Sequence, residues 1–132
     1  MQGQFHFAYN VTDLTVARHF YGEVLGCPEG RSTDTWVDFD FFGHQISLHL
    51  GDPFATAPTG HVGKHMVPMP HFGAILRAED FKALAARLDG HEIDFEIPPT
   101  LRFPGEPGEQ WTMFLRDPFG NPIEFKSFTE AT

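Results

Sequence analysis

The residues of this chain best suited to chemistry are His6, His71 and Glu124, which occur at related positions in two similar halves. Residues 5–8 (FHFA) resemble residues 70–73 (PHFG), so the two histidines coincide when the halves are aligned. Two imidazoles and one carboxylate, if brought together, form a facial ligand set that suits divalent iron, manganese or similar metals. Such a set leaves coordination positions open for water and substrate. A metal-dependent site is therefore the first hypothesis.

The similarity between the halves extends beyond the two histidines. Residues 35–39 (TWVDF) and 42–47 (FGHQIS) are echoed by residues 110–114 (QWTMF) and 119–124 (FGNPIE). The further aligned pairs are Trp36 with Trp111, Gly43 with Gly120, and Ser47 with Glu124. Because self-similarity within a chain indicates repeated structural units, we expect two similar units packed together.

A further histidine, His49, follows Ser47 by two residues and so shares its face of a predicted strand. A single histidine on a strand is more often a surface or core residue than a ligand, and His49 has no partner in the repeat. Three roles remain open for it, namely fourth metal ligand, general base and polar lining of a pocket. We take it as the catalytic candidate.

The elements that must position these residues follow from hydrophobic periodicity and turn signals. Thr12 and Asp13 are suited to cap the start of a helix, and Gly26 to end it. The first half is expected to contain a strand over 4–10, that helix, and strands over 35–42 and 44–50. A linker over 51–69 follows. The second half is expected to contain a strand over 71–77, a helix from Ala78 to Gly90, a strand over 92–97, a loop over 98–108, and strands over 109–116 and 122–128.

Strand alternation separates the candidates from the bulky apolar residues. In the first strand His6, Ala8 and Asn10 share one face, opposite Phe5, Phe7 and Tyr9. In the last strand Glu124 lies opposite Ile123 and Phe125. The residue two positions after each candidate histidine is small, Ala8 or Gly73, which leaves space beside the imidazole.

Composition excludes several classes of partner. The chain has 132 residues, with 9 Lys and Arg against 18 Asp and Glu, for a formal net charge of −9. Neither a nucleic-acid partner nor an anionic membrane surface is expected, because both need a basic patch. Cys27 is the single cysteine, so no internal disulfide is expected and a cytoplasmic location is favoured. No apolar run is long enough to cross a bilayer.

With these residues in place, the chain resembles the vicinal oxygen chelate superfamily. That superfamily includes lactoylglutathione lyase, extradiol dioxygenases, fosfomycin-modifying transferases and bleomycin-resistance proteins. The matching stretches are residues 6–8 (HFA), 20–26 (FYGEVLG), 70–72 (PHF) and 117–125 (DPFGNPIEF). The resemblance implies an α+β fold, in which two repeated βαβββ units form a curved, open mixed sheet around a metal site.

The resemblance also implies a ligand set. Its positions match His6, His71 and Glu124, and the metal would be Fe²⁺, Mn²⁺ or Zn²⁺. The fourth position, a Glu in the lactoylglutathione lyase pattern, falls on Ser47, which is a poor ligand. This departure argues against the isomerase activity and favours the dioxygenase and fosfomycin-modifying branches. Candidates for the pocket wall are Trp36, Trp111, Phe103 and Arg102.

We therefore expect a single glyoxalase-like domain over 1–132, with unit one at 1–50, the linker at 51–69 and unit two at 70–132. The predicted function is that of a metal-dependent enzyme that chelates two vicinal oxygens of a small molecule. The alternative is a non-catalytic protein that sequesters a small molecule, as bleomycin-resistance proteins do. Short two-unit proteins of this superfamily often exchange units, which implies a homodimer with sites built from both chains.

Overall fold

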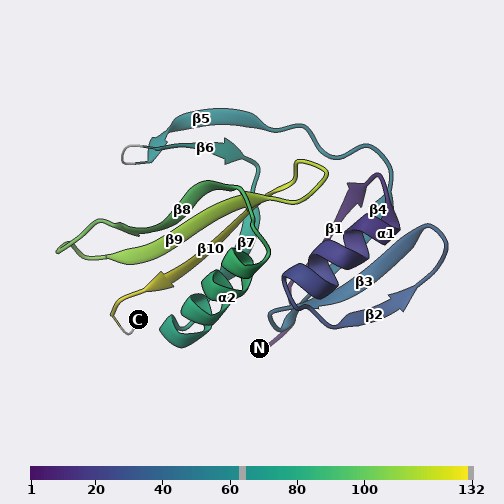
Figure 1. The fold of residues 1–132 in the computed structure, drawn as a ribbon, viewed down its shortest axis with the longest axis horizontal. Coiled ribbons are helices and arrows are strands. Elements are labelled where there is room, and N and C mark those ends of the chain that lie inside the picture. Colours follow the sequence, from purple (N-terminus) through teal and green to yellow (C-terminus); the bar gives the residue numbers. More distant parts are fainter. Residues whose placement is uncertain (63–64, 131–132) are drawn as a thin grey trace. The chain divides into compact units, whose positions relative to one another are not determined.

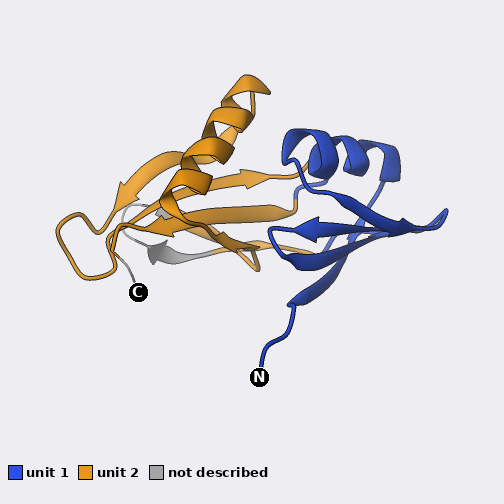
Figure 2. Cartoon of the chain, turned by 90° about the horizontal axis from the view of Figure 1, so that it is seen from below, with its two compact units in different colours: residues 1–54, 118–120 blue, residues 55–117, 121–132 orange. Residues whose placement is uncertain are grey.

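The computed structural model describes residues 1–62 and 65–130, and the chain forms two compact units (Figures 1 and 2). Unit 1 comprises Met1–Phe54 and Pro118–Gly120, and unit 2 comprises Ala55–Asp117 and Asn121–Thr132. Each unit contains one four-stranded mixed sheet and one helical segment. The predicted fold of two repeated βαβββ units is thereby confirmed.

Unit 1 runs strand, helix, then three strands. Its elements are β1 (His6–Val11), α1 (Leu14–Ala17), η1 (Arg18–Val24), β2 (Glu29–Ser32), β3 (Trp36–Phe41) and β4 (His44–Leu50). The strand order is β1-β4-β3-β2, in which β1 pairs with β4 in parallel and the remaining pairs are antiparallel. The strands β1 and β4, which carry the first-half candidates His6, Ser47 and His49, are therefore neighbours.

The helical segment of unit 1 starts where the capping signal predicted. Asp13 is the N-cap, and its side chain accepts a hydrogen bond from the Val16 amide at 3.0 Å. The segment begins as the α-helix α1 and continues as the π-helix η1, where the Leu25 amide bonds to the Phe20 carbonyl, five residues back. Gly26 follows with φ of +78°, a conformation that favours glycine at a helix end.

Unit 2 repeats this order after a hairpin. The hairpin consists of β5 (Ala57–Val62) and β6 (His65–Met69). The remaining elements are β7 (Phe72–Ile75), α2 (Ala78–Gly90), β8 (Phe95–Arg102), β9 (Gln110–Arg116) and β10 (Pro122–Phe128). The strand order is β7-β10-β9-β8, with β7 and β10 parallel, and α2 lies across one face of this sheet (Figure 1). The helix buries Phe81, Leu84 and Leu88.

Two stretches expected to be irregular are extended. Within the predicted linker, apart from residues 63 and 64, which lie outside the described residues, β5 and β6 form a separate two-stranded ribbon in which Pro58 pairs with Pro68. The sequence of this stretch has no sustained hydrophobic periodicity, so periodicity did not reveal the ribbon. In unit 2, β8 starts at Phe95 and continues through Pro98 and Pro99. It is an edge strand with register shifts, and such strands tolerate proline.

The registers of the two sheets test the alignment of the halves. Ala8 pairs with Ser47 in unit 1, as Gly73 pairs with Glu124 in unit 2. The aligned pair Ser47 and Glu124 therefore occupies matching positions.

The predicted equivalence of Trp36 and Trp111 is wrong. Trp36 pairs with His49, whereas the residue at the corresponding place in β9 is Thr112, which pairs with Lys126. Trp111 lies one position earlier, so its side chain points to the opposite face of the sheet.

Candidate functional site

The carboxylate of Glu124 and the imidazole of His71 face each other on the sheet of unit 2. Glu124 lies in β10 and His71 directly precedes the neighbouring strand β7. The distance from His71 Nε2 to Glu124 Oε1 is 3.4 Å, and the two side chains are only 20% and 16% exposed. Parallel pairing of β7 with β10 thus brings together two of the three predicted ligands.

The ring of His71 is held by its other nitrogen. The distance from Nδ1 to the Pro68 carbonyl oxygen is 2.8 Å, and because a carbonyl only accepts, Nδ1 must donate. In the neutral ring Nε2 is then an acceptor that faces another acceptor, Glu124 Oε1. Two acceptor atoms at this distance repel each other unless a proton or a cation lies between them. Metal-bound histidines are commonly held by a carbonyl in this way, so the donor set fits a divalent metal.

The second carboxylate oxygen of Glu124 is held from the neighbouring strand. Thr112, in β9 and almost fully buried, donates from Oγ1 to Glu124 Oε2 at 2.6 Å. This hydrogen bond leaves Oε1 directed toward His71. The two polar partners, Thr112 and the Pro68 carbonyl, were not identified from the sequence, because neither carries a metal-binding side chain.

The protonation equilibria of the pair are coupled. The hydrogen bond with Glu124 raises the pKa of His71, against the opposing effect of burial, and the Pro68 carbonyl raises it further. Burial, the largest single influence on Glu124, acts to raise its pKa. The hydrogen bonds from His71 and Thr112 outweigh burial and lower this pKa. The metal-free pair thus favours an imidazolium beside a carboxylate.

A shallow cavity of about 220 Å³ opens at this pair. Its lining residues are His71, Phe72, Gly73, Ala74, Ile75, Glu124 and Lys126. Gly73 allows the strands to approach here, since a Cβ at this position would lie 1.5 Å from the Glu124 carbonyl oxygen. The Phe114 ring packs edge-on against the His71 ring at 4.9 Å between centroids.

Unit 1 presents His6 in a similar way. His6 is exposed at the start of β1, and its Nδ1 lies 2.7 Å from Gln45 Oε1. Because an amide oxygen only accepts, Nδ1 donates, and in the neutral ring Nε2 is left as an acceptor, as in the neutral form of His71. Ser47, the counterpart of Glu124, donates from Oγ to Asp38 Oδ1 at 2.5 Å. Neither Gln45 nor Asp38 was predicted from the sequence as a site residue.

His49 lies further along the same face of unit 1. It pairs with Asn10, whereas His6 pairs with Gln45, so His49 is four residues or roughly 13 Å from His6 along the strand direction. Its ring is exposed and stacks on Trp36 at 6.3 Å between centroids. The Arg31 guanidinium lies 5.9 Å from the centre of the Trp36 ring. These neighbours are suited to contact a ligand.

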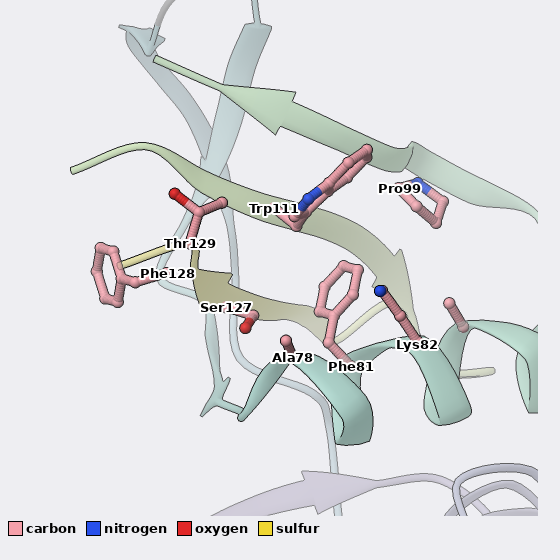
Figure 3. A pocket seen from close by; sticks show the side chains of 9 residues that line it. Ala78, Phe81, Lys82, Pro99, Trp111, Ser127, Phe128 and Thr129 are labelled. Carbon is pink, nitrogen blue, oxygen red and sulfur yellow. The ribbon is translucent and has the colours of Figure 1, made fainter. Parts of the chain in front are cut away.

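The other predicted wall residues lie elsewhere. Trp111 lines a cavity of about 400 Å³ between α2 and the sheet of unit 2, with Phe81, Lys82 and Pro99 around it (Figure 3). This face is opposite to the one that carries Glu124, because Trp111 pairs with Ser127. Arg102 is buried, and its guanidinium lies 5.3 Å from the Phe103 ring.

Within residues 1–62 and 65–130, no three His, Cys, Asp or Glu side chains form a group that could hold a metal ion. His71 and Glu124 form a pair in unit 2, whereas His6 belongs to unit 1. In the same described residues, no helix is long and apolar enough to cross a membrane.

Comparisons with known proteins agree with this architecture. The model of the glyoxalase/bleomycin resistance protein/dioxygenase superfamily matches residues 3–125. A glyoxalase/bleomycin resistance protein/dioxygenase from Alicyclobacillus acidocaldarius is 32% identical, with a TM-score of 0.80 over 98% of this chain and 93% of that one. A search of curated proteins gave no match.

Two fosfomycin resistance proteins are similar in fold. FosX from Listeria monocytogenes is 18% identical, with a TM-score of 0.70 over 98% of this chain and 95% of that one. FosX from Mesorhizobium loti is also 18% identical, with a TM-score of 0.67 over 98% of this chain and 94% of that one. At this level of identity the likeness concerns the fold alone.

Proposed function

Because the chain belongs to the glyoxalase/bleomycin resistance protein/dioxygenase superfamily, we propose that it is a metal-dependent enzyme acting on a small molecule with two vicinal oxygens. The observation that carries this proposal is the facing pair His71 Nε2 and Glu124 Oε1, 3.4 Å apart. His71 Nδ1 donates a hydrogen bond to the Pro68 carbonyl, and Thr112 Oγ1 donates one to Glu124 Oε2. Oriented donors of this kind are typical of metal ligands.

The proposed ligand set is His6, His71 and Glu124, and the metal is Fe²⁺, Mn²⁺ or Zn²⁺. His6 would contribute the third donor, because its Nδ1 is held by Gln45 Oε1 as Nδ1 of His71 is held by the Pro68 carbonyl, and each Nε2 can then face a metal. When bound, the cation supplies Lewis-acid stabilisation of an anion that develops on the substrate oxygens. Ala8, a small residue on the face of β1 that carries His6, would leave room for the substrate beside that ligand.

The reaction class follows from the departure at Ser47. With Ser in place of a carboxylate there, unit 1 lacks the acidic side chain that an isomerase of this superfamily would use to move a proton. We therefore favour a dioxygenase or a fosfomycin-modifying type of reaction. Fosfomycin is the first substrate to test, because the similar FosX proteins are fosfomycin resistance proteins. Catechol is the second, as a dioxygenase substrate with vicinal oxygens.

We also propose a cytoplasmic homodimer. The cytoplasm suits a protein with a single, buried cysteine, Cys27. A homodimer would cover sheet edges that are otherwise open. The small-molecule substrate is the remaining partner, and neither nucleic acid nor a membrane surface is expected for so acidic a chain.

The test is metal binding. Protein purified without added metal is analysed for its metal content, and the metal-free form is titrated with Mn²⁺ and Zn²⁺ by calorimetry. We expect His71→Ala and Glu124→Gln to weaken binding by about 100-fold or more, since each removes a ligand. Matched controls are His19→Ala and Glu106→Gln, which change exposed side chains outside the site and should bind normally.

Two outcomes would overturn the proposal. In the first, the wild-type protein binds no divalent metal. In the second, the ligand variants bind metal as well as the controls do. Tight binding of a small molecule by metal-free protein, without turnover, would favour the alternative of a sequestering protein.

A further inference from the structure

The cavity of about 400 Å³ between α2 and the sheet of unit 2 follows from the residue pattern of the helix. Ala78, Phe81, Lys82 and Ala85 are spaced by three and four residues, so they share one face of α2 and line the cavity. Alanine side chains end at Cβ and leave a gap opposite Trp111, which lines the cavity from β9 and is 41% exposed. A volume of this size is typical of sites for small molecules.

A buried hydroxyl at this cavity has no hydrogen-bond partner within the described part of the chain. Ser127 is 3% exposed and pairs with Trp111 across the sheet, so both side chains lie on the cavity face. The nearby hydroxyl of Thr129, by contrast, donates to Glu109 at 2.8 Å. Burying a hydroxyl without a partner destabilises a folded protein, so packing alone does not explain Ser127. Its hydroxyl can donate to a bound molecule or accept from it.

Lys82 supplies a cation that pairs with no carboxylate among the described residues. The acidic residues of the same helix turn, Glu79 and Asp80, pair instead with Arg77, at 2.6 and 3.8 Å. The Lys82 side chain extends from α2 toward the sheet, past the Phe81 ring (Figure 3). In a chain of net charge −9, the described lining of this cavity thus offers a cation and no carboxylate, which favours an anionic ligand.

The Ser127 and Lys82 ends of the cavity are separated by about one helical turn. The amide of Leu76 bonds to the Lys126 carbonyl, so α2, which begins two residues later, starts at the Ser127 end of β10. Lys82 follows the first helical residue, Ala78, by four residues, or about 6 Å along the helix axis. Substituents at the para positions of a benzene ring span a comparable distance.

We propose that this cavity binds small aromatic carboxylates that carry a hydroxyl group across the ring, such as para-hydroxybenzoate. The ring contacts Trp111 and Phe81, the carboxylate pairs with Lys82, and the hydroxyl bonds to Ser127. Apolar walls with a few polar groups that orient the ligand are typical of such pockets. Because Trp111 and Ser127 lie on the face of the sheet opposite Glu124, this site is separate from the proposed metal site and needs no metal.

The test is calorimetric titration of the metal-free protein with three probes. The first, para-hydroxybenzoate, carries both polar groups, whereas benzoate lacks the hydroxyl and para-hydroxybenzamide lacks the charge. We expect para-hydroxybenzoate to bind most tightly, with a Kd on the order of 0.1 mM. The indole N–H resonances report the location. The Trp111 signal, assigned with the variant Trp36→Phe, should shift on binding, and the Trp36 signal should not.

Each polar contact has its own variant. We expect Lys82→Gln to weaken para-hydroxybenzoate about fivefold and to leave the neutral benzamide unchanged. We expect Ser127→Ala to weaken para-hydroxybenzoate about fivefold to tenfold and benzoate little, because benzoate has no hydroxyl to bond. Lys82 is exposed, so its variant decides the question even if Ser127→Ala fails to fold. Matched controls are Arg87→Gln, another exposed cation of α2, and Ser32→Ala, an exposed hydroxyl of unit 1, which should bind all three probes normally.

Wild-type protein that binds none of the probes at millimolar concentration would overturn the inference. Equal affinity of Lys82→Gln and Arg87→Gln for para-hydroxybenzoate would overturn it as well. A second copy of the chain would also cover Trp111. If sedimentation shows that Trp111→Ser turns a dimer into a monomer, this face is a subunit interface and the ligand site is refuted. All of these measurements use metal-free protein, so none of their outcomes bears on the proposed metal site.

Discussion

His71 Nε2 lies 3.4 Å from Glu124 Oε1, and the opposite ring nitrogen is bonded to the Pro68 carbonyl. Without a metal the gap between these two atoms is suited to a proton, which makes the pair an imidazolium beside a carboxylate. With a metal the same two atoms are free to act as ligands. In the proposed metal site a proton and a cation would therefore compete for one position, and metal binding would depend on pH.

The first prediction concerns the pH dependence of stability in the metal-free protein. The raised pKa of His71 gives stability that is fully present below the ordinary value of 6.5 and is lost as the pH rises through the folded-state value. The lowered pKa of Glu124 gives stability that is present above 4.5 and is lost as the pH falls through the folded-state value. Both contributions are present between these two ordinary values.

The measurement is the free energy of unfolding in urea across this range. We expect His71→Gln to lose about 1 kcal/mol relative to wild type inside the window and much less at alkaline pH. Saturating Mn²⁺ should remove the alkaline loss in the wild type, because the cation takes the place of the proton. Parallel pH profiles for wild type and His71→Gln would contradict the prediction.

The second prediction concerns Thr112, which holds the second oxygen of Glu124. Thr112→Val keeps the side-chain shape but leaves Oε2 without its donor. We expect Mn²⁺ affinity to fall about tenfold, as for other residues that orient a metal ligand. Thr112→Ser keeps the hydroxyl and should restore most of the affinity. Calorimetric titration of the wild type and the two variants measures these affinities. Equal Mn²⁺ affinity of the Val and Ser variants would show that the Thr112 hydroxyl does not orient Glu124.

The repeat in the sequence identified His6 with His71 and Ser47 with Glu124 because the parallel strand pairs have the same register in both units. The alignment of the halves failed for Trp111 because it assigned the wrong length to the turn before the last strand of unit 2. This turn is one residue longer than the corresponding turn of unit 1. Residues 117–121 lie between the paired residues Arg116 and Pro122, whereas residues 41–44 lie between their counterparts, Asp40 and Gln45. Aligning Trp36 with Trp111 requires a turn that is two residues longer in unit 2, whereas the observed difference is one residue. A shift of one residue moves every side chain of a strand to the opposite face of the sheet.

Asp38 was within reach of sequence reasoning. It lies as far before the Phe42-Gly43 turn as Ser47 lies after it, so a two-residue hairpin must pair them. The contact of Thr112 with Glu124 could not be predicted from the sequence, because Thr112 pairs directly with Lys126 and reaches Glu124 diagonally. The role of the Pro68 carbonyl was also hidden, since it depends on a backbone atom and sequence patterns describe side chains.

The third prediction concerns Gly73, where β7 approaches β10. An added Cβ would lie 1.5 Å from the Glu124 carbonyl oxygen, so backbone atoms must move. We expect Gly73→Ala to lower the free energy of unfolding by about 3 kcal/mol and to weaken metal binding. Gly90→Ala is the matched control, because a Cβ there meets nothing within 4 Å. Chemical denaturation of both variants tests this, and similar stabilities would count against the close approach.

The fourth prediction concerns His49, which stacks on Trp36 well along the sheet from His6. We expect His49→Ala to lower activity or ligand binding several-fold while the metal content stays near wild type, because the ring is too far from His6 to share its ion. Metal analysis and a substrate assay on the same preparation measure both effects. Complete loss of metal in this variant would instead make His49 a direct ligand.

The fifth prediction concerns the origin of the ligands in the proposed homodimer. We expect His6 of one chain to join His71 and Glu124 of its partner. A dimer of His6→Ala chains alone or of Glu124→Ala chains alone then binds no metal, because every site lacks a ligand. A mixed dimer contains one site that carries both changes and one site that carries neither. Random mixing makes half of the dimers mixed, so about a quarter of all sites regain a full ligand set.

The two variants are mixed in equal amounts after reversible dissociation, and bound Mn²⁺ is measured per chain. Each variant alone serves as its own control and should bind almost none. Wild-type protein taken through the same dissociation gives the maximum. If each site lies within one chain, every site in the mixture lacks either His6 or Glu124, and no mixture recovers binding. Recovery near a quarter of the wild-type value therefore distinguishes shared sites from sites within one chain.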